Sequence, residues 1–215
     1  MVSRFAIAIL IFIALISWYL TLAASGLSIP SYWHKPASIM ISVLSTVLLV
    51  FERWAWSWPI VRLLAHRPDL RGTWRVEIKS LWIDPETGKT VPPIRAYFCI
   101  AQTFSKLAIR QFTQESHSSS LTATIQENDG EAYTVFGIYH NDPNVSVSYR
   151  SRSHHGSLKM EFIEDSKPRM KGKYWTERMT TGELDAERVS KKKGGDFVSS
   201  ARIESEAEAL GALKP

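Results

Sequence analysis

The sequence T-W-R-V-E-I-K-S-L-W-I at residues 73–83 determines how the larger part of the chain folds. Its apolar residues Trp74, Val76 and Ile78 alternate with charged ones. Successive side chains of a β-strand point to opposite faces, so this alternation predicts a strand with one buried and one solvated face. Trp74 is therefore expected to lie in a core, where it would plug one end of a barrel, rather than in a ligand site.

Similar alternating segments follow, separated by turn sequences such as D-P-E-T-G-K at 84–89 and N-D-P-N at 141–144. The further expected strands are 94–104, 107–113, 121–125, 133–139, 145–149, 158–163, 170–176 and 183–188. Consecutive strands joined by short turns are antiparallel neighbours that share one interior. A closed meandering barrel and a two-sheet sandwich both satisfy this pattern. We favour an all-β domain whose antiparallel meander closes into a small barrel of about eight strands.

Two apolar runs precede the β domain. Phe5–Ala24 carries no charge, and its twenty residues span roughly 30 Å as a helix, the thickness of a hydrocarbon core. Ala37–Trp58 carries Glu52 and Arg53 near its end and finishes in tryptophans, which favour the membrane interface. These runs predict a hairpin of two transmembrane α-helices. A signal peptide cleaved after Ala24 is the alternative, but the apolar run exceeds the usual ~7 to 15 residues.

The expected organisation has four parts. These are a transmembrane hairpin at 1–60, a juxtamembrane link at 61–69, a β-barrel sensor domain at 70–189 and a mobile tail with a marginal helix at 190–215. Arg4 and a basic stretch after residue 60 flank the two spans, whereas the connection between them carries only Lys35. Basic residues stay on the cytoplasmic side, which predicts a multi-pass protein with both termini in the cytoplasm.

Charge and cysteine content narrow the function classes. The net charge of +5 is spread among acidic residues rather than gathered in a stripe, which disfavours DNA or RNA as a partner. The only cysteine, Cys99, agrees with a reducing compartment. Adjacent His154 and His155 point to opposite faces of a strand and cannot chelate one metal together. With no nucleophile, phosphate-loop or dinucleotide motif, we expect neither an enzyme nor a bound metal or cofactor.

Polar residues that share the parity of the buried face near strand ends are the candidate binding residues. A buried polar group without a partner costs about 1 to 3 kcal/mol, so such residues are usually met by protein, water or a ligand. The candidates are Gln102, Gln111, Thr113, Tyr149, Arg150, Arg152, Thr176 and Arg178. The arginines would pair with phosphate, while Tyr149, Tyr174 or Trp175 would stack on a base. Alternatively, these residues cap the strands and face solvent.

The order of several short motifs resembles a known family, the two-transmembrane, β-strand-rich effectors of CBASS anti-phage systems. The motifs are L-R-G-T-W-R-V at 70–76, I-A-Q at 100–102, S-H-S-S-S-L-T-A at 116–123, H-G at 155–156 and G-K-Y-W-T-E-R-M-T-T-G at 172–182. The resemblance implies a barrel that binds a cyclic dinucleotide made by a partner synthase of the cGAS/DncV-like type. It further implies self-association in the bacterial inner membrane, disruption of that membrane and death of the infected cell.

Two other functions fit the same sequence. G-T-W at 72–74 also begins a lipocalin-like strand, so a membrane-anchored barrel that carries an apolar small ligand is one alternative. The other is a structural membrane protein whose barrel is filled by its own aromatic side chains. A cavity and the polarity of its lining distinguish these functions from a nucleotide sensor.

Overall fold

The computed structural model describes residues 31–61, 67–83, 88–128, 132–149, 151–163 and 167–212, together with 12, 15, 16, 18–20 and 23. The chain forms two compact units, which are described separately below. The first comprises Met1–His66 and Thr103–Ser105, and the second comprises Arg67–Gln102 and Lys106–Pro215.

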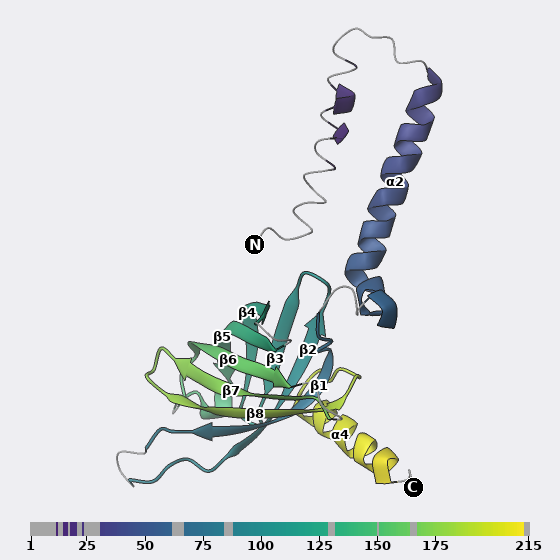
Figure 1. Cartoon of the computed structure of the whole chain (residues 1–215). Helices are drawn as coiled ribbons and strands as arrows, with labels where there is room; N and C mark the ends of the chain where they lie inside the picture. Colours follow the sequence, from purple (N-terminus) through teal and green to yellow (C-terminus); the bar gives the residue numbers. More distant parts are fainter. Residues whose placement is uncertain are drawn as a thin grey trace. The chain divides into compact units, whose positions relative to one another are not determined.

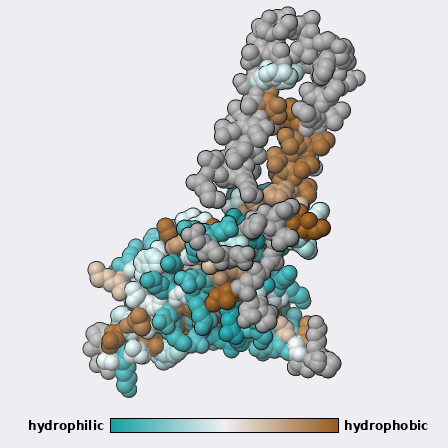
Figure 2. Space-filling model, in the orientation of Figure 1, coloured by the Kyte–Doolittle hydropathy of each residue, from teal (hydrophilic) through white to brown (hydrophobic). Residues whose placement is uncertain are grey.

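The first unit contains the long helix α2, Ser31–Arg53, followed by the short 3-10 helix η1, Ala55–Ser57 (Figure 1). Apolar residues gather along α2 in Figure 2, and Val43, Val47 and Leu49 are each more than half exposed at 56%, 57% and 67%. No helix among the described residues combines the length and the apolar character needed to cross a membrane. Most of the expected first span, Phe5–Ala24, lies outside the described residues, so the hairpin stays a prediction.

The second unit is a closed barrel in which each strand pairs with the next and β8 pairs with β1, all antiparallel (Figure 1). The strands are β1 Gly72–Ser80, β2 Ile94–Gln102, β3 Leu107–Phe112, β4 Ser116–Glu127, β5 Tyr133–Pro143, β6 His154–Ile163, β7 Arg169–Thr176 and β8 Thr181–Ser190. The barrel of about eight antiparallel strands is confirmed, and the two-sheet sandwich is excluded because no edge remains open.

Two sequence-based expectations near the end of β5 were wrong. N-D-P-N was expected to turn the chain at 141–144, yet Asn141 and Asp142 continue β5, paired with Ser118 and His117 of β4. The strand expected at 145–149 is instead a short 3-10 helix, η2, at Val145–Val147. Cross-strand hydrogen bonds from β4, which begins five residues earlier than expected at Ser116, outweigh the local turn preference.

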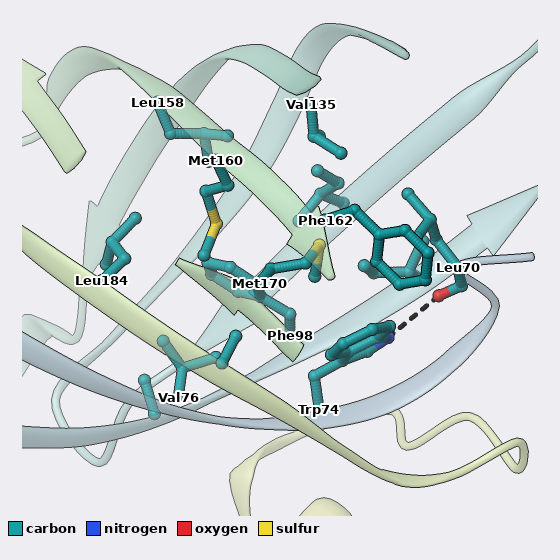
Figure 3. Packing of buried hydrophobic residues seen from close by; sticks show 14 of the residues in the cluster. Leu70, Trp74, Val76, Phe98, Val135, Leu158, Met160, Phe162, Met170 and Leu184 are labelled. Atoms are coloured by element: carbon teal, nitrogen blue, oxygen red, sulfur yellow. Dashed lines mark hydrogen bonds between the residues drawn. The ribbon is translucent and has the colours of Figure 1, made fainter. Parts of the chain in front are cut away.

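Apolar side chains fill one end of the barrel. Figure 3 shows Trp74, Phe162 and Leu70 packed together there, and the Trp74 indole N–H donates a hydrogen bond to the Leu70 carbonyl oxygen at 2.9 Å. The rings of Trp74 and Phe162 meet edge to face, with centroids 6.3 Å apart. Trp74 is fully buried, as its place in the alternating pattern predicted. Because this end is filled, any internal ligand must occupy the other half of the barrel.

The C-terminal region differs from the expected mobile tail. Residues Phe197–Ala212 form helix α4, which packs on the outer face of β1, β2 and β8. Glu204 of α4 is buried, with 1% of its surface exposed, and accepts hydrogen bonds from Tyr97 at 2.5 Å, from Arg75 at 3.0 Å and from Arg95. The helix sequence taken alone predicts only marginal stability, because the partners that stabilise the helix lie on strands far away in the chain.

Candidate functional site

The open half of the barrel holds a cavity of about 1100 Å³. Known small-molecule sites measure roughly 300–1,000 Å³, so this cavity is large enough for a ligand bigger than a single nucleotide. Its polar lining consists of Ser80, Arg95, Gln111, Thr113, Gln114, Glu115, Ser116, Ser118, Tyr139, Asn141, Ser151, His154, Tyr174, Thr176, Arg178 and Thr180. The half of the interior that the apolar core leaves empty therefore presents many hydrogen-bonding groups beside apolar side chains such as Ile78, Leu158 and Leu184.

Four of these polar side chains lie level with one another on adjacent strands. Gln111 of β3 pairs with Ser118 of β4, Ser118 pairs with Asn141 of β5, and Asn141 pairs with His154 of β6. All four line the cavity, and Ser118 and Asn141 are only 4% and 7% exposed. The Ser118 hydroxyl donates to Asn141 Oδ1 at 2.8 Å. We call Gln111, Ser118, Asn141 and His154 the polar row.

A second polar group surrounds the turn between β7 and β8. The hydroxyls of Thr176 and Thr180 lie 2.7 Å apart, and the Thr176 hydroxyl accepts a hydrogen bond from the Arg178 backbone N–H at 3.2 Å. Met179 in the same turn has φ of 59°, the left-handed conformation that non-glycine residues rarely adopt. The Arg178 guanidinium is exposed at the rim and donates to the Ser151 hydroxyl at 3.3 Å. This turn places a permanent positive charge at the mouth of the cavity.

Aromatic side chains complete the wall. Tyr139 and Tyr174 line the cavity between the core and the mouth, and Trp82 lines it just beyond the end of β1. Burial raises the pKa of the Tyr139 hydroxyl above its usual value, and the nearby Tyr174 adds to the shift. Tyr139 therefore remains an uncharged donor at neutral pH. Flat rings of this kind offer surfaces on which a nucleobase can stack.

The structure brings four of the predicted site residues to this cavity. Gln111, Thr113, Thr176 and Arg178 all line it. Gln102 lies instead at the filled end, where its side chain accepts a hydrogen bond from the Leu70 backbone N–H at 2.8 Å and donates to the Pro68 carbonyl at 3.0 Å. The side chain of Gln102 points into the barrel, as its parity predicted. However, Gln102 is the last residue of β2, at the filled end of the barrel, so it forms hydrogen bonds with the backbone there and does not line the cavity.

Of the other three predicted residues, Tyr149 and Arg152 do not line the cavity. Tyr149 follows η2 and is 83% exposed, and Arg152 is exposed as well. Arg150 lies outside the described residues. The described residues between β5 and β6, 144–149 and 151–153, form no strand, so the alternation used to select Tyr149 and Arg152 does not apply to them.

Sequence reasoning missed three members of the polar row as binding candidates. Asn141 was assigned to a turn, although it continues the parity of Val135, Gly137 and Tyr139. Ser118 was noted only within the motif S-H-S-S-S-L-T-A at 116–123, and His154 was considered only as a metal ligand. The opposite orientation of the two histidines is confirmed, because His154 lines the cavity whereas His155 contacts Glu177 at 3.6 Å.

The arrangement suits reversible binding of a polar, anionic molecule. Neutral donors and acceptors line the wall together with the charged residues Arg95 and Glu115, and Arg178 stands at the rim. Among the residues that the structure describes, no group of three or more His, Cys, Asp or Glu is arranged to hold a metal ion. A barrel that is filled at one end and carries a deep polar cavity at the other belongs to the class of small-ligand receptors.

Comparison with known proteins identifies the kind of receptor. Residues 65–188 match the family model described as "Cap15, cyclic dinucleotide receptor domain", and the chain belongs to this family. The match covers β1 to most of β8 and ends before α4. It confirms the resemblance to CBASS effectors, and the matched family is described as a receptor domain rather than as an enzyme.

Two curated relatives carry the same name, CD-NTase-associated protein 15. The protein from Staphylococcus schleiferi is 24% identical over 152 residues, covering 71% of this chain and 78% of the relative. The protein from Yersinia aleksiciae is 27% identical over 175 residues, covering 77% of this chain and 80% of the relative. Both alignments exceed the length of the barrel alone, which is the part matched by the family model.

Proposed function

We propose that this chain is a CBASS effector whose barrel cavity binds a cyclic dinucleotide made by a partner nucleotidyltransferase. The observation that carries this proposal is the polar cavity of about 1100 Å³ within the segment that matches a cyclic dinucleotide receptor domain. Such a ligand has two phosphates, which Arg178 would bind at the rim through charge-assisted hydrogen bonds. Its two bases would enter the cavity, where Tyr139, Tyr174 and Trp82 provide stacking surfaces.

The cavity also weighs against the two other functions that fit the sequence. A carrier of an apolar ligand would be lined predominantly by apolar side chains, whereas here hydroxyl and amide groups line the cavity beside the apolar ones. A purely structural barrel would be filled along its whole length, whereas only one end is filled. Neither alternative explains why Ser118, Asn141 and Thr176 are buried around an internal space.

We further propose that ligand binding promotes self-association in the bacterial inner membrane and that the assembled hairpins disrupt the bilayer. Support comes from the charge-free run at 5–24 and from the exposed apolar side chains of α2. Linking barrels through a ligand-induced contact would raise the local concentration of hairpins in the plane of the membrane. The proposed location is multi-pass, with both termini and the barrel in the cytoplasm.

The first test is thermal unfolding of the purified full-length chain in detergent with a panel of cyclic dinucleotides and GMP as the linear control. A ligand at 100 times its Kd stabilises the folded state by about 2.7 kcal/mol, which raises Tm measurably. We expect one or more cyclic species to raise Tm and GMP to leave it unchanged. An unchanged Tm with every cyclic species would overturn the proposal.

Arg178→Ala tests the role of the rim. A hydrogen bond to a charged group contributes about 1.5 to 3 kcal/mol, so we expect affinity for the cyclic dinucleotide to fall about tenfold or more by calorimetry. Arg169→Ala is the matched control, because Arg169 is an exposed arginine of β7 that does not line the cavity. Equal losses in the two variants would remove Arg178 from the binding site.

A further inference from the structure

Two tyrosines of the cavity wall lie over glycines of the neighbouring strands. Tyr139 of β5 pairs with Gly156 of β6, and Tyr174 of β7 pairs with Gly182 of β8. Both glycines belong to sequence motifs noted above, H-G and G-K-Y-W-T-E-R-M-T-T-G. Glycine within a strand weakens the strand and often marks a place where another group approaches closely. The two pairs therefore point to glycine as the residue that makes room for each ring.

The space above Gly156 is occupied by the tip of Tyr139. A Cβ atom added to Gly156 would lie 2.5 Å from Cζ of Tyr139 and closer still to its hydroxyl oxygen. Carbon atoms in favourable contact are about 3.5 to 4.0 Å apart, so the two groups would overlap. The nearest backbone atom, the Trp175 carbonyl oxygen, would be 2.9 Å away. The tyrosine ring therefore keeps its place only while residue 156 is glycine.

Gly182 meets a different environment. A Cβ atom there would lie 2.6 Å from Cε1 of Tyr174, but it would also overlap the Lys79 carbonyl oxygen and lie 3.0 Å from Cα of Ser80. Both backbone atoms belong to β1, so a side chain at 182 would disturb the pairing of β8 with β1. Gly156 is therefore the position at which the placement of a ring can be tested with less effect on the barrel.

Packing sets the position of the Tyr139 ring. Tyr139 packs against the edge of the apolar core, and among the described residues its hydroxyl makes no hydrogen bond. Gly156, which lies beneath the ring, pairs on its other side with Thr176, the last residue of β7 before the turn that carries Arg178. The ring thus lies beside the strand that leads to the arginine at the mouth. A nucleotide whose phosphate binds Arg178 would have Tyr139 as a nearby stacking surface.

We propose that Gly156 is a positioning residue for ligand binding, because it lets the Tyr139 ring rest against the barrel wall, where a base of the cyclic dinucleotide stacks on it. A larger residue at position 156 would push the ring off β6 and into the cavity, since the strand itself lies behind the ring. The displaced ring would then occupy the space that the base needs. This inference rests on the proposed function and deepens it at the same site.

The test is calorimetric titration of the purified full-length chain in detergent with cyclic di-GMP, cyclic di-AMP and cyclic GMP–AMP. For each species that binds the wild type, we expect Gly156→Ala to weaken binding about tenfold or more, and Tyr139→Ala to weaken it similarly through loss of stacking. Gly137→Ala is the matched control, because an added Cβ at this glycine of β5 meets the Leu158 side chain at 3.4 Å, an ordinary contact. It should bind like the wild type.

The double variant separates positioning of the ring from general damage to β6. If Gly156 acts through Tyr139, adding Gly156→Ala to Tyr139→Ala should cause no further loss of affinity. This comparison also decides the question if Gly156→Ala alone lacks a cooperative thermal transition, because Tyr139→Ala removes the overlapping ring. A further loss in the double variant, or wild-type affinity in Gly156→Ala or Tyr139→Ala, would overturn the inference but leave the proposed function intact. Absence of binding of all three ligands to the wild type would overturn both.

Discussion

At the scale of single residues, Trp74 illustrates how one side chain serves both packing and hydrogen bonding. It is fully buried, contacts Phe162 edge to face and donates to the Leu70 carbonyl. The Arg188 guanidinium lies 5.6 Å from the centre of its ring, a distance at which the cation is attracted by the ring face. Trp74 therefore joins the start of β1 to the apolar core at the filled end.

Trp74→Phe should destabilise the barrel by about 1 to 3 kcal/mol. The change leaves the Leu70 carbonyl without its donor and opens space in a close-packed core. Urea unfolding of the full-length chain, followed by circular dichroism, measures the change in the free energy of unfolding. Trp82→Phe is the control, since Trp82 is 43% exposed and lies at the mouth. If both variants unfolded at the wild-type urea concentration, Trp74 would not have this role.

Polar residue type combined with strand parity identified part of the candidate site. Gln111, Thr113, Thr176 and Arg178 were selected because they continue the buried parity of their strands toward the mouth, and the cavity is lined by all four. Gln102 satisfied the same rule and yet lies at the filled end. Parity gives the face of a strand that a side chain occupies, but it does not give the height at which an internal cavity begins.

At the scale of elements, one buried carboxylate helps to hold helix α4 on the barrel, beside the ring contact between Phe197 and Tyr97. Burial acts to raise the pKa of Glu204, but hydrogen bonds from Tyr97 and Arg95 and the charges of Arg95 and Arg75 outweigh it, so the pKa lies below its usual value. Burial, with the Glu204 carboxylate adding to it, also raises the pKa of Tyr97 to about 12. Tyr97 therefore remains a donor across the physiological range.

Glu204→Gln should weaken the docking of α4. The neutral amide loses the attraction of two arginines, although both are partly exposed and screened, so we expect a loss of about 1 to 3 kcal/mol. Hydrogen exchange of α4 backbone amides in the full-length chain reports this loss directly. Glu208→Gln is the control, because Glu208 is 68% exposed and its carboxylate lies 3.7 Å from Arg75. Equal exchange rates in the wild type and Glu204→Gln would contradict the role of Glu204 as the anchor.

The same carboxylate predicts how the stability of α4 depends on pH. The pKa of Glu204 is lower in the folded chain than its ordinary value of 4.5, so the unfolded state binds more protons between the two values. The stabilisation is therefore complete above about 4.5 and is lost as pH falls through the lower folded pKa. Thermal unfolding of the wild type and Glu204→Gln across this range should give Tm values that converge in acid. A constant difference at every pH would contradict the prediction.

Local turn chemistry and cross-strand pairing competed most clearly at β5. The sequence N-D-P-N favours a turn, yet its first two residues pair with His117 and Ser118 of β4. Because this extension carries Asn141 to the level of Ser118, it completes the polar row. The turn preference of a four-residue sequence does not take into account hydrogen bonds to a strand more than twenty residues away.

At the scale of the whole molecule, the proposed function requires ligand binding to change the association of complete chains. We expect the cyclic dinucleotide that raises Tm to increase the molecular mass of the full-length chain in detergent, measured by light scattering after size exclusion. Arg178→Ala, at a ligand concentration that saturates only the wild type, should retain the ligand-free mass. If the mass stayed constant while the ligand bound, sensing would not operate through self-association.

The sequence by itself determined the period of the strands and their antiparallel order, because alternation and turn chemistry are properties of neighbouring residues. Closure into a barrel rather than a two-sheet sandwich was decided by the pairing of β8 with β1. Only the tertiary structure decided which polar residues meet. Gln111, Ser118 and Asn141 become neighbours through the register of β3, β4 and β5, and that register depends on hydrogen bonds between strands. Likewise, α4 is held because Glu204 meets Arg75 and Tyr97, which lie more than a hundred residues earlier in the chain.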